Sequence, residues 1–319
     1  MKAAVLHRLG VTPRCEDFAE PTAQDGEALI RVRAASLKSV EKQMAAGSHY
    51  ASPKEFPAIC GLDGVGELED GTRVFFGGPR KPFGAMAERT VAPRAFCFSL
   101  PPSIDDATAA ALPNPGISAY LVLTQNAKLV QGERVLILGA TGIAGKLAVQ
   151  IAKLLGASSI VAGGRNPEAL NNLRELGADA TIQLDQTEDQ LQKSFSRESG
   201  KEGFNVVIDY VWGKPTEAFL AAMTQSEFMS IGSETRLIQV GESAAPVISL
   251  PAAVLRSRAL TIRGTAGIPP RDALATAMKQ VMDWAAAGLL RIETQTVPLT
   301  EIEEAWSRPD RSRRLVVIP

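Results

Sequence analysis

The sequence has few residues of the types that build metal and disulfide sites. Its 319 residues include two histidines and three cysteines. The cysteines, Cys15, Cys60 and Cys97, are far apart and odd in number, which excludes a disulfide framework and a Cys-x-x-Cys metal knuckle. With only His7 and His49, the chain lacks an HExxH motif and any site built on several histidines of one helix. We therefore expect a protein of a reducing compartment, the cytoplasm.

Two other classes of protein are disfavoured by what is missing. Lys and Arg number 34 and Asp and Glu 35, so a net charge of −1 offers no basic excess to a nucleic-acid partner. No apolar run approaches the roughly 18 residues of a membrane-spanning helix, and we expect no membrane partner. The N-terminal apolar run breaks at His7, too early for the core of a signal peptide. Hydrophobic residues at 45% and charged residues at 22% are typical of a globular chain, here of about two domains.

The chain changes character twice. Its first hundred residues carry short apolar runs between Gly and Pro residues, which predicts many short strands, with one short helix over 36–46. From residue 133 strands and helices alternate, which predicts an α/β fold with a doubly wound parallel sheet. The segment after Gly264 is short for a domain, so we expect it to fold back on the N-terminal region. Its elements are expected at 271–289 (helix), 292–298 (strand), 300–307 (helix) and 315–318 (strand).

The alternating region supplies the elements of the predicted sheet. The run RVLILG has no polar alternation, which favours a strand buried on both faces. We expect strands at 134–139, 159–162, 180–184, 204–211, 236–241 and 259–263. We expect helices at 104–112, ended by the prolines that follow, and at 117–129, 143–155, 167–176, 187–199 and 215–223.

A glycine-rich loop joins the first of these strands to the next helix. Small residues there let the backbone approach the phosphates of a dinucleotide, and the helix N-terminus supplies N–H donors. The pattern is a near variant of GxGxxG, and its place between strand and helix favours a cofactor loop over a plain tight turn. The residues concerned are Gly139, Ala140, Thr141, Gly142, Ile143, Ala144 and Gly145.

A nucleoside-triphosphate loop is a different reading of the same segment, because Lys146 follows a glycine. That motif requires Gly-x4-Gly-Lys-Ser/Thr, and Ala140 and Leu147 occupy two of its fixed positions. We therefore reject a nucleoside triphosphatase.

The end of the second strand predicts which dinucleotide binds. An NAD site usually places a carboxylate there, about 20 residues beyond the loop, to bind the ribose 2′-hydroxyl. Here the chain has Gly164 and Arg165, and its first carboxylate is Glu168. A guanidinium can pair with a 2′-phosphate, so we predict NADPH. The alternative is that Arg165 is an ordinary solvated loop residue.

Several segments together resemble the medium-chain dehydrogenase/reductase superfamily, on its zinc-independent quinone oxidoreductase (zeta-crystallin-like) branch. The resemblance runs the length of the chain, and the order and spacing of the segments carry it. They are the start MKAAVL, Ala34–Glu41, Gly47–Tyr50, Phe56-Pro57, Gly61–Gly66, Gly116–Tyr120, the glycine loop, Gln150–Ala157, Leu176–Asp179 and Leu315–Pro319. It implies a GroES-like β-barrel catalytic domain made of 1–116 and 266–319, and an NADP-binding Rossmann domain of 117–265, with the active site at their junction.

The resemblance also implies that no zinc is bound. Zinc-dependent members place a Cys near position 38 and a His-Glu pair near 62 and 63, where this chain has Lys38, Leu62 and Asp63. The four-cysteine lobe of the structural zinc is missing too. Without a Lewis acid, hydride transfer favours acceptors that are already electron-poor, such as quinones and α,β-unsaturated carbonyls.

Negative charge that develops on the substrate oxygen then requires donors from the protein. The resemblance points to Tyr50, at the substrate-side tyrosine of the family, and to Lys38, where the branch commonly has Asn. Each has an alternative: Lys38 as a surface lysine, and Tyr50 as a rim residue with its hydroxyl in water. Further cofactor contacts carried over by position are Ser118, Gly241, Gly264, Thr265 and Arg314.

Three functions follow from these expectations. The first is an NADPH-dependent reductase of quinones or enones. The second is a ketone or aldehyde reductase, which remains open because Lys38 can replace part of the role of zinc. The third belongs to another class: a non-catalytic NADPH-binding protein, crystallin-like or a sensor, because Lys38 and Gln43 depart from the branch.

The oligomeric state is predicted from one strand. The strand at 259–263 is expected at a sheet edge, where its alternation of apolar and polar residues favours a homodimer.

Overall fold

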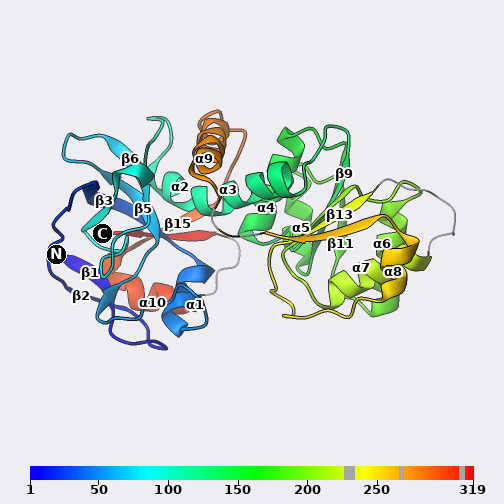
Figure 1. Ribbon diagram of the computed structural model, residues 1–319, viewed down its shortest axis with the longest axis horizontal. Coiled ribbons are helices and arrows are strands. Elements are labelled where there is room, and N and C mark those ends of the chain that lie inside the picture. The colour runs from blue at the N-terminus through cyan, green and yellow to red at the C-terminus, as the bar shows by residue number, and fades with distance from the viewer. Residues whose placement is uncertain (226–233, 266, 268, 309–312) are drawn as a thin grey trace. The chain divides into compact units, whose positions relative to one another are not determined.

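The computed structural model describes residues 1–225, 234–265, 267, 269–308 and 313–319. The chain divides into two compact units (Figure 1). Unit 1 contains Met1–Asn114 and Met278–Pro319, and unit 2 contains Pro115–Ala277. Both chain ends therefore belong to unit 1.

A six-stranded parallel sheet forms the centre of unit 2. Its strand order is β11-β10-β9-β12-β13-β14. The chain runs from β9 outward to β11 on one side and then from β12 to β14 on the other, which confirms the predicted doubly wound sheet. The strands are β9 (Arg134–Leu138), β10 (Ser159–Gly164), β11 (Ala180–Gln183), β12 (Val206–Asp209), β13 (Thr235–Gln239) and β14 (Leu260–Gly264).

Helices join these strands, and local sequence signals account for most of their ends. Thr187 accepts a hydrogen bond from the Gln190 N–H and begins α6. The helix expected at 104–112 ends before Pro113, as predicted, and Pro113 also begins the next helix, because proline fits the first turn, where its missing N–H has no partner to lose. The helices are α3 (Pro113–Leu121), a π-helical turn (Val122–Asn126), α4 (Ile143–Leu154), α5 (Pro167–Asn172), α6 (Glu188–Ser199), α7 (Lys214–Gln225) and α8 (Ala252–Ser257).

Unit 1 is built on antiparallel strands. A three-stranded sheet has the order β2-β1-β4, and a second sheet has the order β15-β16-β3-β5-β6-β8, with β7 also paired to β3. The strands are β1 (Lys2–Leu6), β2 (Arg14–Asp17), β3 (Glu27–Leu37), β4 (Ala58–Ile59), β5 (Asp63–Glu67), β6 (Arg73–Gly77), β7 (Arg89–Pro93), β8 (Cys97–Ser99), β15 (Thr294–Pro298) and β16 (Arg314–Ile318).

Short helices complete unit 1. One long helix has residues in both units, because the division of the chain falls between Ala277 and Met278. The helix α2 begins at the cap Asp105, which accepts from the Thr108 N–H. The helices are α1 (Ser39–Ala46), α2 (Asp106–Ala111), α9 (Arg271–Ala286) and α10 (Ile302–Ser307), with 3₁₀ turns at Arg94–Phe96 and Leu299–Glu301.

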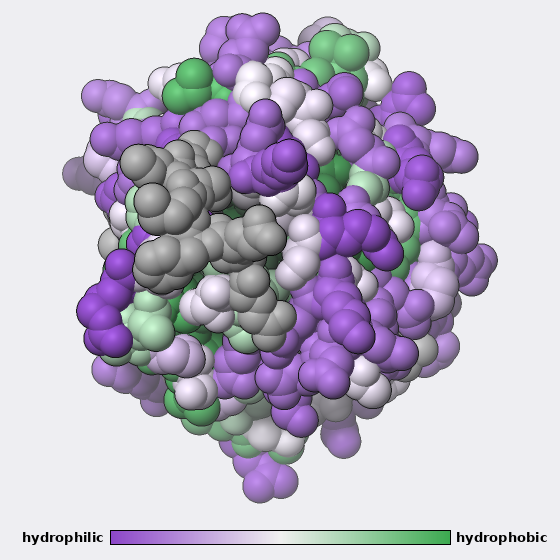
Figure 2. All heavy atoms as spheres, turned by 90° about the vertical axis from the view of Figure 1, so that its right-hand side faces the viewer, coloured by the Kyte–Doolittle hydropathy of each residue, from purple (hydrophilic) through white to green (hydrophobic). Residues whose placement is uncertain are grey.

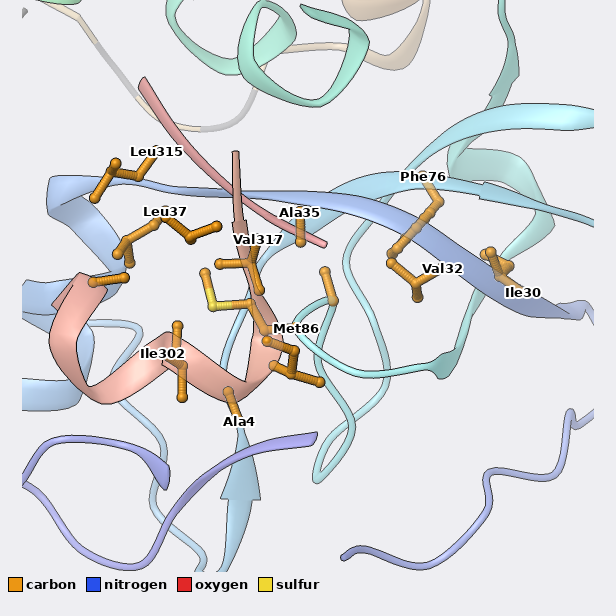
Figure 3. Packing of buried hydrophobic residues seen from close by; sticks show 14 of the residues in the cluster. Ala4, Ile30, Val32, Ala35, Leu37, Phe76, Met86, Ile302, Leu315 and Val317 are labelled. Carbon is orange, nitrogen blue, oxygen red and sulfur yellow. The ribbon is translucent and has the colours of Figure 1, made fainter. Parts of the chain in front are cut away.

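The C-terminal strand joins the N-terminal sheet. β16 lies antiparallel to β3, with Val317 opposite Ala35, and β15 lies parallel to β16. Figure 3 shows the result: Leu315 and Val317 lie among the side chains of β3, and Ile302 of α10 lies close by. The predicted return of the tail to the N-terminal region is thus confirmed. Burial of this apolar cluster fixes the end of β3, from which α1 begins.

The surface shown in Figure 2 is mostly hydrophilic, with apolar residues in small separated groups. Among the described helices, none combines the length and apolar character needed to cross a membrane.

Candidate functional site

The glycine loop has the geometry of a tight strand-to-helix turn. Gly139 has φ +83°, a left-handed conformation that favours glycine. The N–H groups of Gly139 and Ala140 donate to the Gly163 carbonyl at 2.9 and 2.8 Å, which fixes the loop to the end of β10. Gly142 is the N-cap of α4 and, as a glycine, has no side chain to cap the helix. No side chain of the N-cap residue therefore occupies the first N–H groups of α4, which are the groups that an anion site uses.

Close approach of the backbone explains two further glycines of this edge. A Cβ on Gly145 would lie 2.3 Å from the Gly139 carbonyl oxygen, so no larger residue fits without moving backbone. A Cβ on Gly164 would lie 2.4 Å from Cγ2 of Thr141. The predicted residues of the loop and the end of β10 therefore pack against each other in unit 2.

Arg165 directly follows Gly164 in the chain. It is exposed, and no ion pair is assigned to it within the described part of the chain. Asn166 accepts from the Glu168 and Ala169 N–H groups and begins α5. Glu168, the first carboxylate along the chain after β10, thus lies within the helix, and Arg165 directly follows the end of β10, where the sequence predicts a 2′-phosphate contact.

A buried carboxylate organises the loop after β12, next to the glycine loop. Asp209 accepts from the Val211 and Trp212 N–H groups at 2.8 Å and from the Thr216 hydroxyl at 2.5 Å. Burial raises the pKa of this carboxyl, and the three hydrogen bonds partly offset the rise. The sequence did not single out Asp209; a carboxylate at the end of an apolar strand, followed by a glycine four residues later, was its only signal.

The remaining predicted cofactor residues are spread over unit 2. Gly241 packs on the same loop, since its Cβ would lie 2.8 Å from the Tyr210 carbonyl oxygen. Ser118 is half-buried in α3. Gly264 and Thr265 are exposed at the end of β14, three strands from β9 and hence about 14 Å away at the usual strand spacing. The structure therefore groups Gly241 with the glycine loop and does not group Gly264 or Thr265 with it.

In unit 1, Lys38 lies in a buried ion cluster. Its side chain is 2% exposed, so the alternative of a surface lysine is wrong. The ammonium Nζ lies 2.9 Å from Oε1 of Glu41 and 2.9 Å from Oδ1 of Asp63. It also donates to the hydroxyl and the carbonyl oxygen of Ser36, at 3.0 and 3.2 Å. All three N–H bonds of the ammonium are thus used inside the protein.

Backbone groups complete the cluster. Glu41 also accepts from the Lys38 N–H at 2.7 Å and from the Leu62 N–H at 3.1 Å. The cluster therefore joins the end of β3, the first turn of α1 and the start of β5. Glu41 and Asp63 were not among the predicted site residues. The resemblance brings positions 38 and 63 together, but no local pattern in the sequence indicates that Lys38, Glu41 and Asp63 form an ion cluster.

Charge in this cluster is strongly coupled. Burial disfavours the charged Lys38, but the two carboxylates outweigh it and raise the pKa of the ammonium. Burial likewise raises the pKa of Glu41, and the neighbouring Asp63 adds to the rise while Lys38 opposes it. One ammonium thus faces two carboxyl groups at a site with almost no exposure.

Arg314 lies beside this cluster at the start of β16. It is buried, and Nη1 donates to the Leu37 carbonyl oxygen at 3.2 Å. A pocket of about 340 Å³, counted with its open mouth, has Glu41 in its lining. Cys60 lines this pocket, and burial raises the pKa of its thiol to about 12.

Tyr50 presents the opposite environment. It is 94% exposed, and its ring lies against the His49 imidazole with 4.1 Å between ring centroids and 32° between planes. His49 Nδ1 accepts from the Ala51 N–H at 3.1 Å, which fixes the imidazole beneath the phenol. Among the described residues, no hydrogen bond links Tyr50 to Lys38.

The side chains at positions 38, 62 and 63 do not fit a catalytic metal. An ammonium cannot ligate a cation, and Leu62 has no donor atom. Among the described residues, no group of three His, Cys, Asp or Glu side chains is arranged to hold one.

Comparisons with known proteins agree with this geometry. Residues 144–286 match the family described as zinc-binding dehydrogenase; the match does not include positions 38, 62 and 63. A chloroplastic quinone oxidoreductase homologue of Spinacia oleracea is 31% identical over 64% of this chain and 65% of its own length. An NADPH-dependent alkenal/one oxidoreductase of Arabidopsis thaliana is 31% identical over 51% and 46%. The chain thus spans about half to two thirds of these relatives.

Solved structures cover the whole chain. The quinone oxidoreductase of Thermus thermophilus, determined with and without NADPH, is 28% identical with a TM-score of 0.81 over 100% of both chains. That of Escherichia coli, complexed with NADPH, is 19% identical with a TM-score of 0.85 over 100% of both. The likeness confirms the predicted fold, a Rossmann sheet with a GroES-like domain. Together these matches support a place for the chain in the medium-chain dehydrogenase/reductase superfamily, on its quinone oxidoreductase-like branch.

Proposed function

We propose that the protein is an NADPH-dependent, zinc-independent oxidoreductase that reduces quinones or α,β-unsaturated carbonyls. One observation supports NADPH as the cofactor. The glycine loop is hydrogen-bonded to the end of β10, Arg165 directly follows that strand, and no carboxylate stands at the position of a ribose 2′-hydroxyl contact. The relatives named as NADPH-dependent, and the neighbours solved with NADPH, support the same choice.

The residues of unit 2 fit this cofactor. The start of α4 and the glycines before it would hold the diphosphate, and Arg165 would pair with the 2′-phosphate. When bound, NADPH supplies a hydride, which with one proton reduces a quinone to a hydroquinone or saturates an enone. Asp209, through its hydrogen bonds to the next loop, keeps the floor of this site rigid.

The substrate class rests on the side chains that replace the zinc ligands. Without a metal to polarise a carbonyl, hydride transfer is fastest to acceptors whose product charge is delocalised, such as quinones and enones. Names of relatives point to the same chemistry: quinone oxidoreductase, alkenal/one oxidoreductase and 2-methylene-furan-3-one reductase.

We assign different parts to the two predicted catalytic residues. Tyr50, exposed and supported by His49, offers an aromatic face to a planar acceptor and a hydroxyl to its oxygen. Lys38 uses its three N–H bonds internally, so we assign it a positioning part: it fixes the turn from β3 into α1.

The test is NADPH oxidation, followed at 340 nm, with a panel of one naphthoquinone, one enone, one enal and one simple ketone. The proposal expects oxidation with the first three and little with the ketone. Reduction of the ketone alone would favour a ketone reductase. Tight NADPH binding with no oxidation across the panel would favour a non-catalytic NADPH-binding protein.

We further propose a homodimer formed through β14. This strand ends the parallel sheet, so one row of its backbone groups faces no strand of the described sheet. Thr261 and Arg263 are exposed on it, while Leu260 and Ile262 pack partly on the core. Sedimentation equilibrium tests the dimer, and a monomer at micromolar concentration would refute it.

The three free cysteines favour a reducing compartment such as the cytoplasm.

A further inference from the structure

Tyr210 lies at the edge of the sheet where NADPH is proposed to bind, but it is not among the residues assigned to the cofactor. It follows β12 directly, and its N–H donates to the Leu138 carbonyl at the end of β9 at 3.1 Å. A Cβ placed on Gly139, the first residue of the glycine loop, would lie 3.1 Å from the Tyr210 Cβ. β9 and β12 are the central neighbours from which the sheet winds in opposite directions, and ligands of such sheets bind in the crevice at this point.

The hydroxyl of Tyr210 is buried and has no hydrogen-bond partner among the described residues. Burial also raises the pKa of this phenol, so it stays protonated and remains a donor. A buried donor without an acceptor is unfavourable, because its bond to water is lost and not replaced. The residue as a whole is partly exposed, so Tyr210 lies near the surface of unit 2 and not deep in its core.

The segment around Tyr210 is held in one conformation. Asp209 binds the two N–H groups that follow Tyr210, and its own carbonyl accepts from Val240 and Gly241 at 2.8 and 3.1 Å. Trp212 has φ +57°, a left-handed conformation that is strained for a bulky residue. Strain of this kind is retained mainly where a loop holds a ligand. The backbone of Tyr210 is therefore held in place beside the glycine loop.

We propose that the Tyr210 hydroxyl binds the cofactor, donating a hydrogen bond to an oxygen of the diphosphate–ribose backbone of NADPH. The inference rests on the proposed NADPH site and adds to it a residue that neither the glycine pattern nor the resemblance supplied. Phosphate and ribose oxygens are the acceptors that a dinucleotide offers next to a glycine loop. The bound cofactor then supplies the acceptor that the described residues do not.

The test compares wild type, Tyr210→Phe and the control Thr90→Val in two measurements. The first is the Kd for NADPH, from the change in nicotinamide fluorescence on binding. The second is the Tm of each protein without cofactor. The proposal expects Tyr210→Phe to weaken NADPH binding about tenfold, with an unchanged or higher Tm, because the variant loses an unsatisfied donor from the free protein. Thr90→Val removes another buried hydroxyl that has no partner among the described residues, in unit 1, and should leave the Kd for NADPH unchanged.

The outcomes separate this inference from the function on which it rests. Failure of the wild type to bind NADPH would refute the proposed function itself. If the wild type binds and Tyr210→Phe binds equally well, the function stands and the inference is overturned. A Tm of Tyr210→Phe several degrees below wild type would also overturn it, since the hydroxyl would then serve a partner inside the free protein. Weaker binding of 2′-phospho-ADP-ribose by the variant would place the contact on the diphosphate or adenosine side.

Discussion

The ammonium of Lys38 lies 2.9 Å from the carboxylate of Asp63, with side-chain exposures of 2% and 11%. Because Glu41 binds the same ammonium at 2.9 Å, one positive charge holds two carboxyl groups together inside unit 1. Lys38, which the resemblance predicts near the substrate, thus links β3, α1 and β5.

Removal of this ammonium should be costly. Lys38→Met leaves two carboxyl groups buried without a cation, and we expect the free energy of unfolding to fall by about 3–5 kcal/mol. Urea denaturation measures it. The control is Lys2→Met, which breaks an exposed pair with Asp17 and should leave the urea midpoint nearly unchanged. Equal midpoints for Lys38→Met and wild type would show that the buried cluster contributes nothing.

Glu41 should make stability depend on pH. Its pKa is raised in the folded protein, so the folded state holds its proton more tightly than the unfolded chain does. Stability from this group is therefore complete below the unfolded pKa of about 4.3 and is lost as pH rises through the folded pKa. Between pH 5 and pH 8, the urea midpoint of wild type should fall relative to that of Glu41→Gln, which cannot ionise. A wild-type midpoint that rises with pH relative to the variant would contradict the direction of this shift.

Arg165 should determine the choice between the two nicotinamide cofactors. Arg165→Ala removes the proposed partner of the 2′-phosphate, and we expect the preference for NADPH over NADH to fall by about 1.5–3 kcal/mol, the scale of a hydrogen bond to a charged group. The ratio of kcat/KM values for the two cofactors measures this. NADH serves as the internal control, because its kcat/KM should change little. An unchanged ratio would remove Arg165 from the site.

The glycine loop offers a matched pair of substitutions. Gly145→Ala would place a Cβ 2.3 Å from the Gly139 carbonyl oxygen, and we expect a loss of about 1–3 kcal/mol in stability together with weaker NADPH binding. Gly142→Ala places its Cβ 3.5 Å from the same oxygen at φ −74°, so it should fold as stably as wild type. Thermal unfolding distinguishes them. Similar Tm values for the two variants would mean that the loop tolerates a Cβ at both positions.

The sequence predicted the parallel sheet well because its signals are local. An unbroken apolar run, a glycine turn and a helix with apolar residues on one face recur in unit 2, and each strand there was expected close to its observed place. Strand β5 shows the limit. Its glycines, Gly64 and Gly66, were interpreted as turns, yet a Cβ on either would clash with β3, at the Ala34 oxygen or the Ile30 side chain. Glycine there reflects contact between strands, which one strand alone does not reveal.

The candidate site was predictable to a similar degree. The glycine loop and Arg165 follow from spacing along the chain. The Lys38 cluster does not, because Asp63 stands 25 positions from Lys38 and reaches it through the pairing of β3 with β5. Asp209 and Tyr210 were missed for the same reason: their importance depends on neighbouring strands that are distant in sequence.

The most direct test of the central claim is NADPH oxidation by protein dialysed against EDTA, with a quinone as acceptor and metal content measured on the same sample. We predict full activity without stoichiometric zinc, because Lys38 and Leu62 leave no ligand set for it. One zinc per chain, with activity that is lost on its removal and restored by its return, would contradict the account.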